Sequence, residues 1–95
     1  MRARAAILAV LVAACSGGQG SVTGLVVEVE GDLEVVTSFT LNAGGIEYRF
    51  VPIPGVVYEF PLPHLREHLR EAAPVTVDYR DNGGGSLEVL GLADS

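Results

Sequence analysis

A single helix-like segment among strand-like runs is the feature that most constrains the fold. It covers residues 61–74, PLPHLREHLREAAP, in which Leu62, Leu65 and Leu69 recur at three- and four-residue spacing. This spacing predicts an apolar stripe on one α-helix. Pro74 predicts the end of the helix, because the residue before a proline disfavours helical geometry. A helix of about ten residues is too short to be stable alone, so its leucines must pack against another element.

Three strand-like runs precede this helix. Residues 22–30, 33–41 and 46–51 show alternation of apolar and polar side chains, most clearly in the second run. A period of two with β-branched residues indicates strands that bury one face. Gly31-Asp32 and the NAGG run at 42–45 predict hairpin turns between them. The side chains expected to face the core are Leu33, Val35, Thr37, Phe39, Leu41, Ile46, Tyr48 and Phe50.

Two more strand-like runs follow the helix. Residues 75–80 alternate cleanly, and DNGGG at 81–85 predicts a turn. In residues 86–93 the alternation shifts by one residue beside Gly91, which predicts a bulge or a bend. Between the third strand and the helix, residues 52–60 break the pattern, and both a strand fragment and a covering loop are open there.

The order of elements is therefore β-β-β-α-β-β, a mainly β class. Closing five short strands into a small barrel removes the edges that an open sheet would expose, and the helix between strands 3 and 4 can plug one end. Over residues 22–93 this order resembles the OB-fold; a short sandwich or an SH3-like barrel is the alternative. The runs FPLPHLREHL and APVTVDYR are similar to those of small bacterial envelope proteins without an established activity.

The first fourteen residues have the features of a secretory signal peptide. Arg2 and Arg4 supply positive charge, and the apolar run at 5–14 spans about 15 Å, roughly half a bilayer core. The sequence VAAC at 12–15 resembles the lipobox of bacterial lipoproteins. The resemblance implies cleavage before Cys15 and acylation of its thiol, with fatty acids such as palmitate. Ordinary secretory cleavage that leaves a free thiol is the alternative.

The composition that remains after cleavage limits the classes of partner that the protein can bind. Residues 15–21 are expected to hold the lipidated Cys15 and a flexible tether, and residues 22–95 the barrel domain. Loss of residues 1–14 leaves four arginines against twelve acidic residues, a net charge of 4 − 12 = −8. Such a surface repels phosphates, so no nucleic acid partner is expected. We expect membrane attachment through the lipid, on the extracytoplasmic face or in the periplasm, and an envelope protein or glycan as partner.

Two histidines on the helix suggest a metal site. His64 and His68 are four residues apart and share a helix face. Two imidazoles at this spacing can bind Zn²⁺ or Cu²⁺, and Glu67 or Glu71 can add an oxygen. Each histidine precedes a leucine of the apolar stripe, which favours surface histidines that border the core. The inverted zinc-peptidase pattern H-x-x-E-H also matches, but so small a domain leaves no room for a third ligand and a cleft. No catalytic residue, enzyme activity or cofactor is expected.

The outward face of strands 2 and 3 is the candidate contact surface, because OB-folds commonly bind ligands there. Its polar to acidic character, with the aromatics turned inward, disfavours nucleic acid. The candidate contact residues are Glu34, Val36, Ser38, Thr40, Glu47 and Arg49, followed by Ile53, Val56 and Tyr58, which in the alternative cap the core. The sequence thus favours a lipid-anchored, non-catalytic binding or interaction module of the bacterial envelope, with divalent-metal binding as the alternative.

Overall fold

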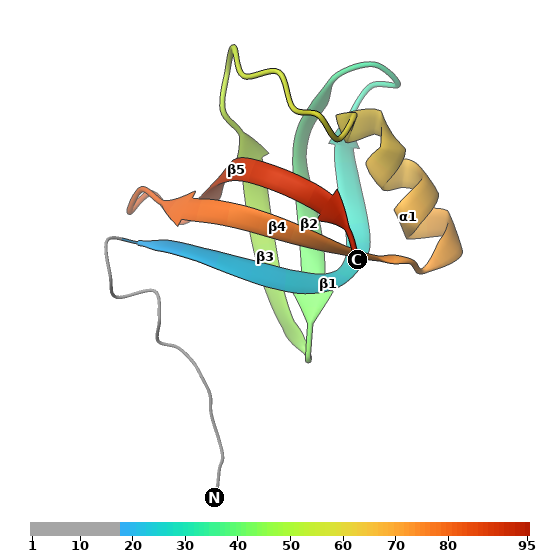
Figure 1. Cartoon of the computed structure of the whole chain (residues 1–95), viewed down its shortest axis with the longest axis horizontal. Coiled ribbons are helices and arrows are strands. Elements are labelled where there is room, and N and C mark those ends of the chain that lie inside the picture. The colour runs from blue at the N-terminus through green and yellow to red at the C-terminus, as the bar shows by residue number, and fades with distance from the viewer. Residues whose placement is uncertain (1–17) are drawn as a thin grey trace, which may run out of the picture.

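The computed structural model describes residues 18–95, so the predicted signal peptide and Cys15 lie outside the described range. Five strands form a closed barrel in the order β1-β2-β3-β5-β4 (Figure 1). The strands are β1 (Gln19–Gly31), β2 (Val36–Ala43), β3 (Ile46–Pro52), β4 (Pro74–Asp81) and β5 (Leu87–Asp94). A 3₁₀ turn, η3 (Leu62–His64), leads into α1 (Leu65–Glu71) between β3 and β4. The predicted mainly β order is confirmed, and the barrel fits an OB-like fold.

Strand pairing shows how the barrel closes. Neighbouring strands are antiparallel except β3 and β5, which pair in parallel over three residues only, Phe50 to Pro52 against Leu87 to Val89. The long strand β1 pairs with β4 through its first half and with β2 through its second. Residues 19–21, predicted to be tether, already pair with β4 and so belong to the barrel. Within residues 18–95, no helix is long and apolar enough to cross a membrane.

The core lies inside the barrel and under the helix. Its fully buried side chains are Phe39, Leu41, Phe50, Leu65, Val75, Val77 and Val89. The rings of Phe39 and Phe50 stack with centroids 5.2 Å apart, which joins β2 to β3 across the interior. Phe39, Leu41 and Phe50 were predicted to face the core, and the structure confirms all three.

The prediction that the second strand begins at Leu33 is wrong, because β2 begins at Val36. Leu33 and Val35, expected in the core, lie in the turn between β1 and β2, and Leu33 is 81% exposed. The Asp32 carboxylate accepts hydrogen bonds from the backbone N–H groups of Glu34 and Val35, which fixes a turn longer than Gly31-Asp32. These hydrogen bonds lower the pKa of the Asp32 carboxyl, that from Val35 most. Thr37 and Ile46, also expected inside, are exposed near the strand ends.

The helix is rotated from the predicted position. Leu65 is fully buried, as expected, and Leu62 packs against the core. Leu69 is 39% exposed, whereas His68 is only 6% exposed and takes the inward position. On an α-helix the third and fourth residues after Leu65 lie about 60° to one side of it and 40° to the other, so leucine spacing alone does not decide between them. The prediction that both histidines are surface residues is wrong for His68.

The last strand contains a bulge, and the segment between β3 and the helix is a loop. In the pairing of β4 with β5, Asp78 lies opposite Gly91 and Tyr79 opposite Val89, so Leu90 has no partner. The bulge predicted beside Gly91 is confirmed. Residues 53–61 form a loop and not a strand. This loop and the β1–β2 turn project from the same end of the molecule (Figure 1).

Candidate metal centre

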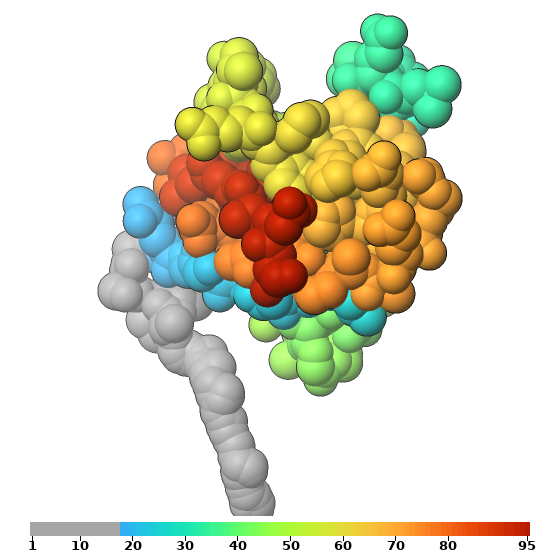
Figure 2. All heavy atoms as spheres, turned by 45° about the vertical axis from the view of Figure 1, so that its right-hand side comes forward, coloured from blue at the N-terminus to red at the C-terminus, as the bar shows by residue number. Residues whose placement is uncertain are grey.

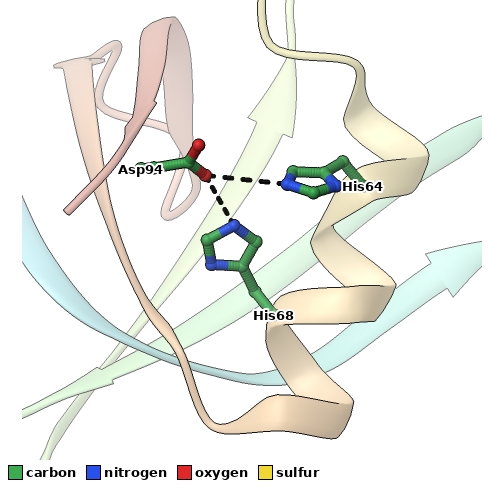
Figure 3. A group of neighbouring side chains, drawn as sticks. All are labelled: His64, His68 and Asp94. Atoms are coloured by element: carbon green, nitrogen blue, oxygen red, sulfur yellow. Dashed lines mark hydrogen bonds and ion pairs between the residues drawn. The ribbon is translucent and has the colours of Figure 1, made fainter.

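Three side chains from two distant parts of the chain converge beside the helix. His64 and His68 come from η3 and α1, and Asp94 comes from the end of β5 (Figure 3). The Nε2 atom of His68 lies 2.7 Å from Asp94 Oδ1, and the Nε2 atom of His64 lies 3.7 Å from the same oxygen. One potential ligand atom from each residue lies within 4.8 Å of the other two. Barrel closure therefore brings a carboxylate to the two imidazoles.

The far nitrogen of each histidine ring is held by an acceptor oxygen. Nδ1 of His68 lies 3.0 Å from the carbonyl oxygen of Ala73, and Nδ1 of His64 lies 2.9 Å from Glu67 Oε1. Because a carbonyl oxygen only accepts, Nδ1 of His68 carries the hydrogen and donates it. Metal-binding histidines commonly have such an outer partner, which fixes the ring and leaves the other nitrogen for the metal. Here both outer partners turn Nε2 toward Asp94.

The local backbone explains these positions. The helix ends at Ala72, which has a left-handed conformation with φ of 54°, and Ala73 donates its N–H back to the carbonyl of His68. This tight ending places the Ala73 carbonyl beside the buried imidazole. Phe60 packs against both rings, with centroids 5.2 Å from His64 and 5.6 Å from His68. His68 can be buried because its Nδ1–H donates to the Ala73 carbonyl, while its Nε2 lies at the carboxylate of Asp94, whose side chain is largely exposed.

The donor set suits a borderline divalent ion. Zinc bonds to imidazole nitrogen and carboxylate oxygen are about 2.0–2.2 Å long, so neighbouring tetrahedral ligands lie about 3.4 Å apart. The distances of 2.7 and 3.7 Å from Asp94 Oδ1 bracket that value. Imidazole and carboxylate ligands favour Zn²⁺ and Cu²⁺, while Cu⁺ prefers thiolate or thioether, which residues 18–95 lack. Three protein ligands leave a fourth position open.

The structure changes the predicted ligand set. His64 and His68 are brought together, with ring centroids 4.9 Å apart. Glu67 contacts His64 and orients it, instead of joining the group of ligands. Glu71 is exposed in the last turn and is not part of the cluster. Sequence reasoning missed Asp94, and only the register of β5 could have pointed to it.

Several residues of the predicted contact face on β2 and β3 are buried. Val36, Ser38 and Thr40 are buried, which corrects the prediction that they form an exposed surface. The Ser38 hydroxyl donates to the Glu30 carboxylate, and Arg49 lies over both, 3.2 Å from Ser38 Oγ and 3.3 Å from Glu30 Oε1. Ser38 first, and Arg49 second, lower the pKa of the Glu30 carboxyl. This network joins β1, β2 and β3 by pairing its polar groups internally.

The other candidate contact residues are more accessible. Glu34, Glu47, Arg49 and Val56 are exposed, but Glu34 lies in the β1–β2 turn and not on the sheet. Ile53 and Tyr58 are half-buried. The Tyr58 hydroxyl accepts from the Ile53 N–H and donates to the Val89 carbonyl, each at 2.8 Å. Tyr58 therefore fastens the β3–α1 loop to β5.

Comparison with known proteins identifies no relative. The chain matches no protein-family model, no curated protein and no solved structure.

Proposed function

We propose that this chain is a non-catalytic, divalent-metal-binding domain that takes up Zn²⁺ or Cu²⁺ at His64, His68 and Asp94. The observation that carries the proposal is the shared orientation of the two imidazoles, each with Nδ1 at an acceptor oxygen and Nε2 toward Asp94. An outer partner on each histidine holds the ring in place for a metal ion. The strongly acidic chain also favours cations over anions.

The sequence supports a place for this domain in the bacterial envelope. The lipobox-like run before Cys15 implies an acylated protein held at the extracytoplasmic face of a membrane. Two or more acyl chains anchor a protein stably, whereas a single chain binds marginally. The domain would then be a small bacterial lipoprotein that binds metal beside the membrane.

Calorimetry on the detergent-solubilised chain tests the metal proposal. We expect saturable binding of Zn²⁺ and of Cu²⁺, with Cu²⁺ the tighter as the general order of affinities predicts. The double variant His64→Ala/His68→Ala should lose this binding, because it removes both nitrogen ligands. Binding heats that are the same in the double variant and the parent would show that the acidic surface, and not this site, takes up the ion.

An interaction role is the second candidate function. It is favoured by two projecting loops that expose apolar side chains, Leu33 and Val35 on one and Val57 on the other, with Val57 94% exposed (Figure 2). Exposed apolar side chains on two loops that project from the same end of a small domain are candidates for a contact surface. Such a role agrees with the lipid-anchored interaction module that the sequence favours.

Affinity capture from detergent-solubilised envelopes tests that role. Leu33→Asp should abolish recovery of a specific partner, because a charge would have to be desolvated in the contact. Ile46→Asp is the matched control, since Ile46 is exposed too but lies in the other hairpin of β2, at its turn to β3. Equal recovery by the parent and both variants would count against this end of the molecule as the contact surface.

A further inference from the structure

Part of strand β5 has a free edge. On one side, β4 pairs with β5 as far as Asp94. On the other side, β3 pairs with it only up to Val89, where β3 ends at Pro52. Within residues 18–95, no backbone hydrogen bond joins residues 90–94 to the β3–α1 loop. An unpaired strand edge presents N–H and C=O groups on which another strand can pair.

A groove lies along this free edge. Val56, Val57 and Glu59 of the loop face Leu90 and Leu92 of β5 across a hollow of about 250 Å³. The Tyr58 hydroxyl, bonded to the Val89 carbonyl, holds the loop beside the strand where β3 leaves it. Figure 2 shows the end of β5 at the surface below this loop.

The shape of the groove suits an extended chain. Val57 and Leu90 give its rim an apolar character, since both are exposed. A Cβ atom built at Gly91 would meet only one neighbour within 4 Å, the Asp78 carboxylate oxygen at 3.9 Å. The outer face of β5 is therefore unobstructed at Gly91.

The negative charge around the groove favours a partner with positively charged side chains. Glu59 lines the hollow, and Asp78 lies opposite Gly91 on the neighbouring strand β4. The described residues carry four arginines against twelve acidic side chains. A partner with basic side chains would gain attraction there, and an acidic one would be repelled.

We propose that the free edge of β5 binds an extended peptide segment that alternates apolar with lysine or arginine side chains. The peptide backbone pairs with β5, its apolar side chains contact the rim of the groove, and its basic side chains meet the acidic residues. Strand addition of this kind takes affinity from backbone hydrogen bonds and specificity from alternate side chains. The inference rests on the interaction role proposed above, gives it a partner class, and does not depend on the metal.

Fluorescence anisotropy with a labelled peptide of four Val-Lys repeats tests the proposal on the detergent-solubilised chain. We expect saturable binding that weakens as salt is raised, and no binding of the Val-Glu peptide. Two N-methylated versions of the Val-Lys peptide, methylated at alternate residues, distinguish strand pairing from charge attraction. The version that blocks the paired N–H groups should bind about tenfold more weakly for each hydrogen bond lost, and the other should bind unchanged.

Two exposed positions locate the contact. Val57→Lys should weaken binding about tenfold through repulsion, whereas Ile46→Lys adds the same charge at the turn between β2 and β3 and should have little effect. Equal binding of both N-methylated peptides, equal effects of the two lysine variants, or no binding at all would overturn the β5 proposal. Envelope capture that still depends on Leu33 would then leave the interaction role standing on another surface. Unchanged peptide binding with EDTA would confirm independence from the metal, and loss of binding would overturn it.

Discussion

Replacement of Leu65 by alanine should lower the free energy of unfolding by about 2–5 kcal/mol. Leu65 is fully buried at the first position of α1 and belongs to the same core cluster as Phe39 and Phe50. Truncation removes apolar contacts and leaves a cavity at the end of the barrel that the helix covers. Stability of so small a domain is expected to be several kcal/mol in total, so the variant should be largely unfolded on mild heating. Urea unfolding followed by circular dichroism measures the change.

Leu69→Ala is the matched control, because it makes the same truncation four residues later in the same helix. Leu69 is 39% exposed, so less surface is returned to water and its loss should cost about 1 kcal/mol or less. A similar loss from both variants would contradict the rotation of the helix described above. A larger loss from Leu69→Ala would restore the original interpretation of the leucine stripe.

The barrel was predictable because alternation and turn residues carry most of its information. The runs containing Phe39, Phe50 and Val77 each have a clear period of two, and turn residues separate the runs within each hairpin. Five such runs with one short helix leave few ways to bury every apolar face without open edges. The bulge at Leu90 was also visible as a shift in period. The order, closure and bulge of the barrel therefore follow from local patterns.

Two of the errors, at Leu33 and at Ser38, have a common physical origin in side-chain hydrogen bonding. The Asp32 carboxylate fixes the turn that removes Leu33 from the strand. Arg49 and Glu30 cover Ser38, so a polar residue on the outward face becomes buried. Periodicity records which side chains are apolar, but not which polar groups will find partners and be buried with them.

Only the histidines of the candidate metal site could be predicted from the sequence. His64 and His68 are a local pair that helix spacing brings together. Asp94 is separated from His68 by 26 residues, and its approach depends on the register between β4 and β5. A barrel can thus supply a ligand that no sequence spacing marks. Glu67, predicted as an oxygen ligand, lies 2.9 Å from His64 Nδ1 in the structure.

Replacement of Asp94 by alanine should weaken Zn²⁺ binding by about 100-fold or more. Loss of an outer partner of a metal ligand commonly costs 10–100-fold in affinity, and loss of a direct ligand should cost at least as much. Glu67→Gln should have the smaller effect, about tenfold, because it alters only the partner of His64 Nδ1. Competition with a chromophoric zinc chelator measures each dissociation constant on the full chain in detergent.

Glu71→Ala is the charge-matched control for Asp94→Ala. Both variants remove one carboxylate, but Glu71 lies outside the cluster, on the exposed part of α1. Its loss should change zinc affinity by less than about twofold, since the attraction of an exposed charge outside the cluster is weakened by solvent and salt. Comparable weakening by Glu71→Ala and Asp94→Ala would mean that the acidic surface attracts the ion without a defined ligand set. A large effect of Asp94→Ala alone would assign the third ligand to the end of β5, where only folding brings it beside the histidines.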